Sequence, residues 1–114
     1  MILVVGGLSS GKRDYVKTQY GYTDSEISSS LSENFPVLYD LQELINTDAD
    51  AERIFPMLLS KRVVICTEIG CGIVPLDAGE RQKREAVGRI CINLAREAER
   101  VVRIQCGLSQ ILKG

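Results

Sequence analysis

The sequence predicts a single α/β domain of the phosphate-loop NTPase type, with a mainly parallel sheet, flanking helices and a C-terminal β-hairpin. Short apolar segments alternate with helical segments along the whole chain, which is typical of a parallel sheet. The segment "GGLSSGK" at 6–12 follows the first apolar segment directly and precedes a helical one. Since a chain of 114 residues matches the size of one domain, we expect residues 1–114 to form one unit.

Composition and charge exclude several classes of function. The formal net charge is −1, so we expect no broad basic surface for nucleic acid. No apolar run approaches the ~18 residues that span a bilayer, and Met1–Val5 is too short for a secretory signal. The four cysteines form no C-x-x-C pair and the chain contains no His, so no zinc site is expected. We expect reduced thiols that serve as small apolar residues in a cytoplasmic protein.

The first third of the chain starts with a β-branched apolar strand at Met1–Val5. After the glycine-rich segment, Lys12–Tyr20 has helical spacing, and Gly21 ends that helix. Residues 22–35 are polar and serine-rich with weak periodicity. We therefore predict a mobile loop over 22–35 and no regular structure there.

The middle of the chain holds a second buried strand at Pro36–Tyr39, which ends at Asp40. Residues 41–46 can form a helical turn or two. Asp48–Ser60 is predicted as a helix, with acidic residues near its start where the helix dipole favours them. Because a Pro inside a helix costs about 3 kcal/mol, we expect Pro56 to kink the helix or divide it in two.

The last part of the chain contains a strand at Arg62–Thr67, a long helix at Ala78–Glu99 and two final strands. The helix opens on a D-x-x-E start signal and carries one apolar stripe at 3.6-residue spacing. The strands are predicted at Val101–Gln105 and Gln110–Lys113, with a tight turn at 106–109 between them.

The predicted sheet brings several chemically active segments together. In open α/β sheets, ligands gather at the carboxyl ends of the parallel strands. The glycine-rich loop, Asp40, Glu68 and the segment 70–75 each follow a predicted strand, so we expect them at one edge of the sheet.

The glycine-rich loop matches the G-x-x-x-x-G-K pattern, in which backbone N–H groups and a Lys bind phosphate oxygens. Its alternative is a glycine turn that only joins strand to helix. The next residue in the pattern is a Ser or Thr that ligates Mg²⁺, whereas here it is Arg13, which cannot ligate a cation but can bind phosphate. The expected cofactors are ATP or GTP and Mg²⁺, for which Arg13 provides no oxygen ligand. The predicted nucleotide-binding residues are Gly6, Gly7, Leu8, Ser9, Ser10, Gly11, Lys12 and Arg13.

The acidic candidates each have two interpretations. Asp40 fits the acidic residue that holds the water shell of Mg²⁺ in phosphate-loop enzymes, or it caps the following helix. Glu68 precedes a segment whose spaced glycines and proline are typical of a backbone that approaches a ligand closely, or of an ordinary connection. The candidate substrate residues around that segment are Gly70, Gly72, Pro75, Arg81 and Arg84, and both arginines can equally form a solvated helical face.

These segments also carry a family resemblance. "MILVVGGLSSGKR", "VVICTEIGCGIVP" and the ending from Arg81 to Gly114 resemble the corresponding blocks of the bifunctional adenosylcobinamide kinase and adenosylcobinamide-phosphate guanylyltransferase family of cobalamin biosynthesis. Arg81, Arg84, Gly88 and Arg89 match, and "FPVLYDLQELI" puts Asp40 at the metal-associated Asp. The resemblance implies a phosphate-loop kinase that phosphorylates adenosylcobinamide and then guanylylates it through a covalent His, in compact homo-oligomers.

The departures from the family pattern leave two functions open. The segment that bears the family's His is absent, and this chain has no His at all, so the guanylyltransferase step is lost. Arg13, Thr67 and Cys91 replace polar residues of the pattern. One interpretation is a cobinamide kinase in which Lys12, Asp40 and Glu68 are catalytic: Lys12 neutralises phosphate charge, Asp40 holds Mg²⁺ indirectly and Glu68 orients metal, water or the substrate hydroxyl. The other is a non-catalytic nucleotide- or phosphate-binding sensor or assembly protein.

Overall fold

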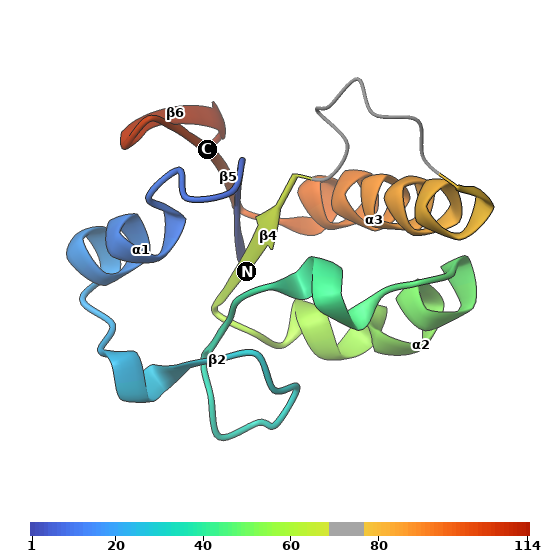
Figure 1. Cartoon of the computed structure of the whole chain (residues 1–114). Coiled ribbons are helices and arrows are strands. Elements are labelled where there is room, and N and C mark those ends of the chain that lie inside the picture. Colours follow the sequence, from blue (N-terminus) through green and yellow to red (C-terminus); the bar gives the residue numbers. More distant parts are fainter. Residues whose placement is uncertain (69–76) are drawn as a thin grey trace.

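The computed structural model describes residues 1–68 and 77–114 and confirms the predicted fold class (Figure 1). Within these ranges a six-stranded sheet has the order β2-β3-β4-β1-β5-β6. Neighbouring strands are parallel except β5 and β6, which form the antiparallel C-terminal hairpin. The strands are β1 Ile2–Gly6, β2 Ile27–Ser28, β3 Val37–Leu38, β4 Val63–Thr67, β5 Arg100–Gln105 and β6 Leu108–Lys113, and the helices are α1 Lys12–Tyr20, α2 Asp48–Leu59 and α3 Ala78–Glu97.

The sheet separates two apolar cores, because successive strand residues point to opposite faces. Leu3 packs with residues of α2 and α3, including Ile54 and Ile90. Its neighbour Val4 packs on the other face against Val16 of α1. In Figure 1, α2 and α3 lie together on one side of the sheet and α1 lies on the opposite side. None of the helices in the described ranges is both long and apolar enough to cross a membrane.

Helix α3 is two residues shorter than the sequence predicts, since it ends at Glu97 instead of Glu99. Ala98 is fully buried in an extended conformation, and the Glu99 N–H donates to the Met1 carbonyl at 3.1 Å. Sheet pairing with the start of the chain thus replaces the last helical residues. The final strand begins earlier than predicted, at Leu108, which leaves a turn of only Cys106 and Gly107.

Helix α2 runs unbroken through Pro56, so the predicted division into two short helices is wrong. Ile54 and Leu58 lie on either side of Pro56 and are both buried in the core. The burial of two aliphatic side chains, each about 1.5–3 kcal/mol, offsets the cost of the missing hydrogen bond.

The serine-rich segment 22–35 contains regular structure that the sequence pattern did not predict. A 3₁₀ turn at Asp24–Glu26 leads into β2, which pairs with β3 at the edge of the sheet. Ile27 is only 5% exposed. Buried Lys61 also holds the segment, because its Nζ donates to the carbonyls of Ser32 and Phe35 at 2.6 Å each.

The phosphate loop is packed tightly against the hairpin. Gly6 at the end of β1 pairs with Ile104 of β5, and a Cβ at Gly6 would overlap the Ile104 carbonyl oxygen. Farther along the loop, the Gly107 N–H donates to the Ser10 carbonyl at 2.9 Å. Only a residue without a side chain fits at Gly6, so the hairpin fixes where the loop begins.

We expect Gly6→Ala to destabilise the fold by about 1–3 kcal/mol, since a Cβ placed against a backbone carbonyl is an overpacked position. Gly7→Ala is the matched control, because a Cβ there meets nothing within 4 Å. The control variant should stay within about 0.5 kcal/mol of the wild type. Urea unfolding of the three proteins measures the difference. Equal stability of both variants would show that the loop can move away from β5 at no cost.

Candidate phosphate-binding site

The predicted nucleotide-binding residues run from the last residue of β1, Gly6, through the connecting loop to the first two residues of α1, Lys12 and Arg13. The loop borders a cavity of about 340 Å³, which is also lined by residues from the ends of β3 and β4. Gly11 has φ 96°, a left-handed conformation that favours glycine, and it leads into the first turn of α1. The cavity therefore lies at the carboxyl ends of the strands and at the N-terminus of a helix, where anions bind favourably. Its lining is Leu8, Ser9, Ser10, Gly11, Lys12, Arg13, Asp14, Tyr39, Asp40, Ile65 and Thr67.

Lys12 lies inside this loop with little contact to solvent. It is 8% exposed, and its Nζ donates to the Gly7 carbonyl at 2.6 Å. Burial lowers the pKa of the Lys12 ammonium, while the neighbouring carboxylates of Asp40 and Glu68 act in the opposite direction. A desolvated ammonium held by one carbonyl gains strongly from an anion, because the anion stabilises its charge.

Ser10 adds an unused polar group next to Lys12. Its Oγ is buried and has no hydrogen-bond partner among the described residues. Buried polar atoms are nearly always paired in folded proteins, so an unpaired hydroxyl calls for a partner. A phosphate oxygen would satisfy it, and the chemistry of the loop thus fits a phosphate group.

Arg13 lies at the rim of the cavity and is held by two contacts. Its Nη2 donates to Asp24 Oδ1 at 3.1 Å, and the guanidinium stacks over the Tyr39 ring, 4.8 Å from the ring centre. Lys17 pairs with the same Asp24 oxygen at 3.1 Å. These contacts connect α1 to the segment before β2 and to the end of β3.

Asp40 shares the cavity with the phosphate loop, as the sequence predicts. Its side chain accepts no hydrogen bond from a backbone N–H of the following 3₁₀ helix, Leu41–Leu44, so the structure does not support the capping interpretation. Instead, Asp40 Oδ1 accepts from Gln42 Nε2 at 3.2 Å. The Oε1 atom of the same Gln42 amide accepts a hydrogen bond from the Thr67 N–H at 3.0 Å. Gln42 thereby ties Asp40 to the end of β4.

Glu68 lies beside the phosphate loop rather than in its cavity. The Glu68 N–H donates to the Gly6 carbonyl at 2.8 Å, and its carboxylate pairs with Arg103 of β5 at 3.5 Å. Glu68 borders a second cavity of about 220 Å³, which Thr67 shares with the first. The second cavity is lined by Val5, Cys66, Thr67, Glu68, Arg84, Val87, Gly88 and Cys91.

The remaining predicted residues divide into three groups. Arg84 lines the second cavity together with Glu68. Arg81 is exposed in the first turns of α3 and lines neither cavity. Gly70, Gly72 and Pro75 lie outside the described residues.

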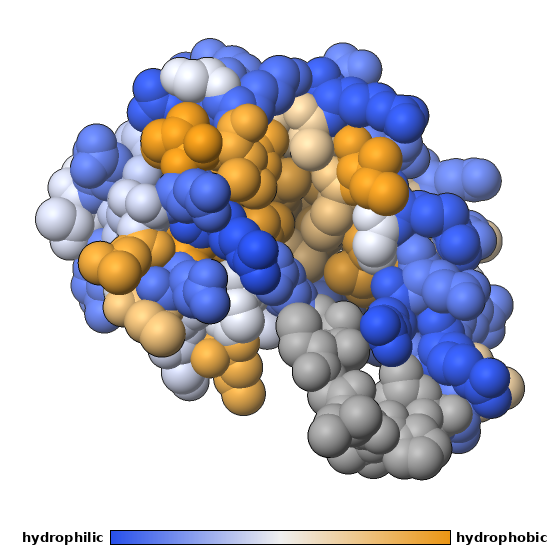
Figure 2. All heavy atoms as spheres, turned by 90° about the horizontal axis from the view of Figure 1, so that it is seen from above, coloured by the Kyte–Doolittle hydropathy of each residue, from blue (hydrophilic) through white to orange (hydrophobic). Residues whose placement is uncertain are grey.

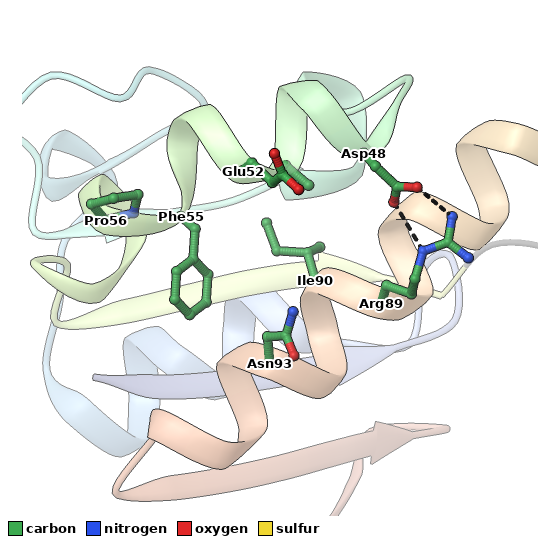
Figure 3. Close-up of a pocket in the computed structure, with 8 residues that line it drawn as sticks. Asp48, Glu52, Phe55, Pro56, Arg89, Ile90 and Asn93 are labelled. Atoms are coloured by element: carbon green, nitrogen blue, oxygen red, sulfur yellow. Dashed lines mark hydrogen bonds and ion pairs between the residues drawn. The ribbon is translucent and has the colours of Figure 1, made fainter.

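Arg89, which matches the family pattern, lines neither of these two cavities. It donates to both Asp48 oxygens, at 2.9 and 2.8 Å, and so joins α3 to the start of α2 (Figure 3). This pair lies at one end of a groove of about 440 Å³ between the two helices, beside Phe55, Ile90 and Asn93. Arg89 thus links two helices on one face of the sheet.

Two partners in the site were not predicted from the sequence. Gln42 and Arg103 contact Thr67 and Glu68 over separations of 25 and 35 residues. The sequence offers one local indication of Gln42, which is its position as a polar residue directly after Leu41 in "LQEL". In the structure the Gln42 side chain is only 7% exposed. Arg103 has an exposed position on β5 and no signal beyond its charge.

The carboxylates of the candidate site do not form a cluster of metal ligands within the described residues. Among residues 1–68 and 77–114, no three His, Cys, Asp or Glu side chains converge on a point that could hold a metal ion. Mg²⁺ at nucleotide sites is held by one or two carboxylates together with phosphates and water. Asp40 therefore fits a metal held mainly by a bound triphosphate.

The face seen from above the view of Figure 1 also exposes apolar surface. Figure 2 shows hydrophobic side chains gathered around a hollow and bordered by hydrophilic ones. The exposed large apolar residues of the phosphate loop and hairpin are Leu8, Leu108, Ile111 and Leu112.

A glycine-rich loop that joins a central parallel strand to a helix, with a buried Lys inside it, defines a phosphate-loop α/β protein. The family model for cobinamide kinase / cobinamide phosphate guanyltransferase matches residues 37–112, and the chain belongs to that family. This confirms the resemblance noted in the sequence. The match includes Asp40, Glu68 and the hairpin, whereas the phosphate loop precedes it. A comparison with curated proteins finds no match.

Proposed function

We propose that this chain is a cobinamide kinase that binds ATP or GTP at residues 6–13 and transfers the γ-phosphoryl group to the hydroxyl of adenosylcobinamide. The family role in cobalamin biosynthesis supports the substrate class. The observation that carries the proposal is the buried Lys12 ammonium, whose only hydrogen bond within the described residues is to a carbonyl of its own loop.

Lys12 and the loop would bind the phosphates. A bound γ-phosphate replaces the Gly7 carbonyl as the partner of Lys12 Nζ and accepts a hydrogen bond from the Ser10 hydroxyl. The helix dipole of α1 favours the same negative charge. In phosphoryl transfer, most of the catalysis comes from such positioning and charge stabilisation.

Asp40 would hold Mg²⁺ through its water shell, and Gln42 fixes the orientation of the Asp40 carboxylate. When bound, the metal neutralises charge that develops on the β- and γ-phosphate oxygens. Arg13 supplies no oxygen ligand, so the protein contribution to metal binding rests on Asp40.

Glu68 would orient the acceptor hydroxyl. It pairs with Arg103, and its N–H donates to the carbonyl of Gly6, where the phosphate loop begins. Arg84 shares that cavity with Glu68 and offers a guanidinium to anionic or polar groups of the substrate. Gly70, Gly72 and Pro75, the substrate residues proposed from the sequence, follow Glu68 along the chain.

The guanylyltransferase step is absent from this proposal. A guanylyl-His intermediate needs a His, and the chain contains none.

A second function is a non-catalytic nucleotide- or phosphate-binding sensor or assembly protein. The observation that favours it is Arg13, which replaces a metal ligand and is held by Asp24 and Tyr39.

In either function we propose a homo-oligomer, because the edge strand β6 leaves Leu108, Ile111 and Leu112 exposed.

We expect Lys12→Met to weaken nucleotide binding by roughly 10- to 150-fold, which corresponds to the loss of one charge-assisted hydrogen bond. Lys17→Met is the matched control, since it removes the same charge from the same helix, and it should change the affinity less than about threefold. Calorimetric titration with ATP and with GTP measures both. If the two variants bind equally well, the loop is only a turn between β1 and α1.

We expect the wild type to bind triphosphate with weak dependence on Mg²⁺, and Arg13→Ser to strengthen that dependence, because Ser offers an oxygen and removes a repelling charge. Asp24→Asn serves as a control that disturbs the Arg13 contact but adds no ligand. It should leave the metal dependence unchanged. Strong Mg²⁺ dependence already in the wild type would mean that another oxygen has replaced the missing hydroxyl.

We expect Glu68→Gln to abolish phosphoryl transfer while leaving the thermal midpoint within about 2 °C, since exposed ion pairs contribute little to stability. Arg103→Gln breaks the same pair from the other side and should retain partial activity. Thermal unfolding and a transfer assay on both variants distinguish a functional role of Glu68 from a structural one. A drop of many degrees in Glu68→Gln alone would make Glu68 a structural residue.

A further inference from the structure

Two cysteines from different elements lie together beside the candidate site. Cys66 is the fourth residue of β4, and Cys91 lies in the second half of α3. Both line the second cavity, and Cys91 packs against the apolar core cluster that contains Cys66. Cys66 is 1% exposed, whereas Cys91 is only partly buried. The cysteines are therefore a pair with one accessible member.

We propose that Cys66 and Cys91 form an oxidisable dithiol site that reacts with hydroperoxides and closes to an intramolecular disulfide. The site lies at the contact between β4 and α3, and its cavity gives a small oxidant a place next to Cys91. This inference does not depend on the proposed kinase activity, because it concerns only these two side chains.

The two thiols have different roles in the reaction. The neighbouring Cys66 thiol lowers the pKa of the Cys91 thiol, while the neighbouring Cys91 thiol and burial raise the pKa of the Cys66 thiol. Thiolate character and exposure decide which cysteine is oxidised first. Cys91 is thus the thiol that reacts with the peroxide, and Cys66 is the resolving thiol.

The reaction balances in two steps. The Cys91 thiolate attacks one peroxide oxygen, the O–O bond breaks, and Cys91 becomes a sulfenic acid while hydroxide or alkoxide leaves and takes up a proton. The Cys66 sulfur then attacks the sulfenic sulfur, the S–O bond breaks, and water leaves with the Cys66 proton. Two thiols lose two electrons in total, and the hydroperoxide accepts them.

The position of the pair gives the disulfide a structural consequence. Cys66 directly precedes Thr67, whose N–H binds Gln42 and through it Asp40. Glu68 follows one residue later. A Cys66–Cys91 bond therefore attaches α3 to the part of β4 that leads into the candidate site.

The test is oxidation of the whole chain with hydrogen peroxide, followed by alkylation of the remaining thiols and mapping of cross-linked peptides by mass spectrometry. The wild type has four cysteines, and we expect it to lose two free thiols and yield a Cys66–Cys91 peptide pair. Dithiothreitol should restore both thiols. The Cys106→Ser control removes the exposed hairpin thiol and should react in the same way.

Cys91→Ala should lose the cross-linked pair and leave Cys66 unmodified, since Cys66 is buried and no cysteine besides Cys91 joins it among the described residues that line the second cavity. The wild-type map decides the proposal even if this variant folds poorly. A map that pairs Cys71 or Cys106 with another cysteine would overturn the proposal. Oxidation of Cys91 to sulfinic acid with Cys66 still reduced would also overturn it.

Discussion

The contact between the phosphate loop and the β5–β6 hairpin is the constraint on which the site depends. Gly6 lies so close to the Ile104 carbonyl that no side chain fits, and the Gly107 N–H holds the Ser10 carbonyl. Because both contacts involve backbone atoms, the loop can take only one position at the end of β1. That placement brings Lys12 and Asp40 into one cavity and buries the Ser10 hydroxyl. It also lets the Gly6 carbonyl accept a hydrogen bond from the Glu68 N–H.

The parts that the sequence predicts correctly are those in which the signal is local. The loop pattern at 6–12 is read directly after an apolar strand, and Asp40 and Glu68 each follow a strand of their own. Since parallel strands end at the same edge of a sheet, the fold class alone brings these residues near one another. The apolar stripe of α3 predicts its buried face in the same way, and Val87, Ile90 and Leu94 are buried.

The parts that the sequence does not predict depend on contacts between distant residues. Strand β2 exists because Ile27 is buried against β3, which no pattern within the serine-rich segment reveals. Core packing on both sides of Pro56 keeps α2 continuous, although local propensity predicts a break. Gln42 and Arg103 become partners of Thr67 and Glu68 only when the sheet is assembled. Local patterns thus place the reactive groups, and tertiary contacts decide how they are held.

The most direct test of the account is transfer of label from γ-³²P nucleotide to cobinamide, followed by chromatography of the corrinoid fraction. A cobinamide kinase predicts labelled cobinamide phosphate with ATP or GTP in the presence of Mg²⁺, and none when Lys12 is replaced by Met. Tight nucleotide binding with no label on cobinamide would contradict the kinase and leave a nucleotide-binding protein built on the same loop.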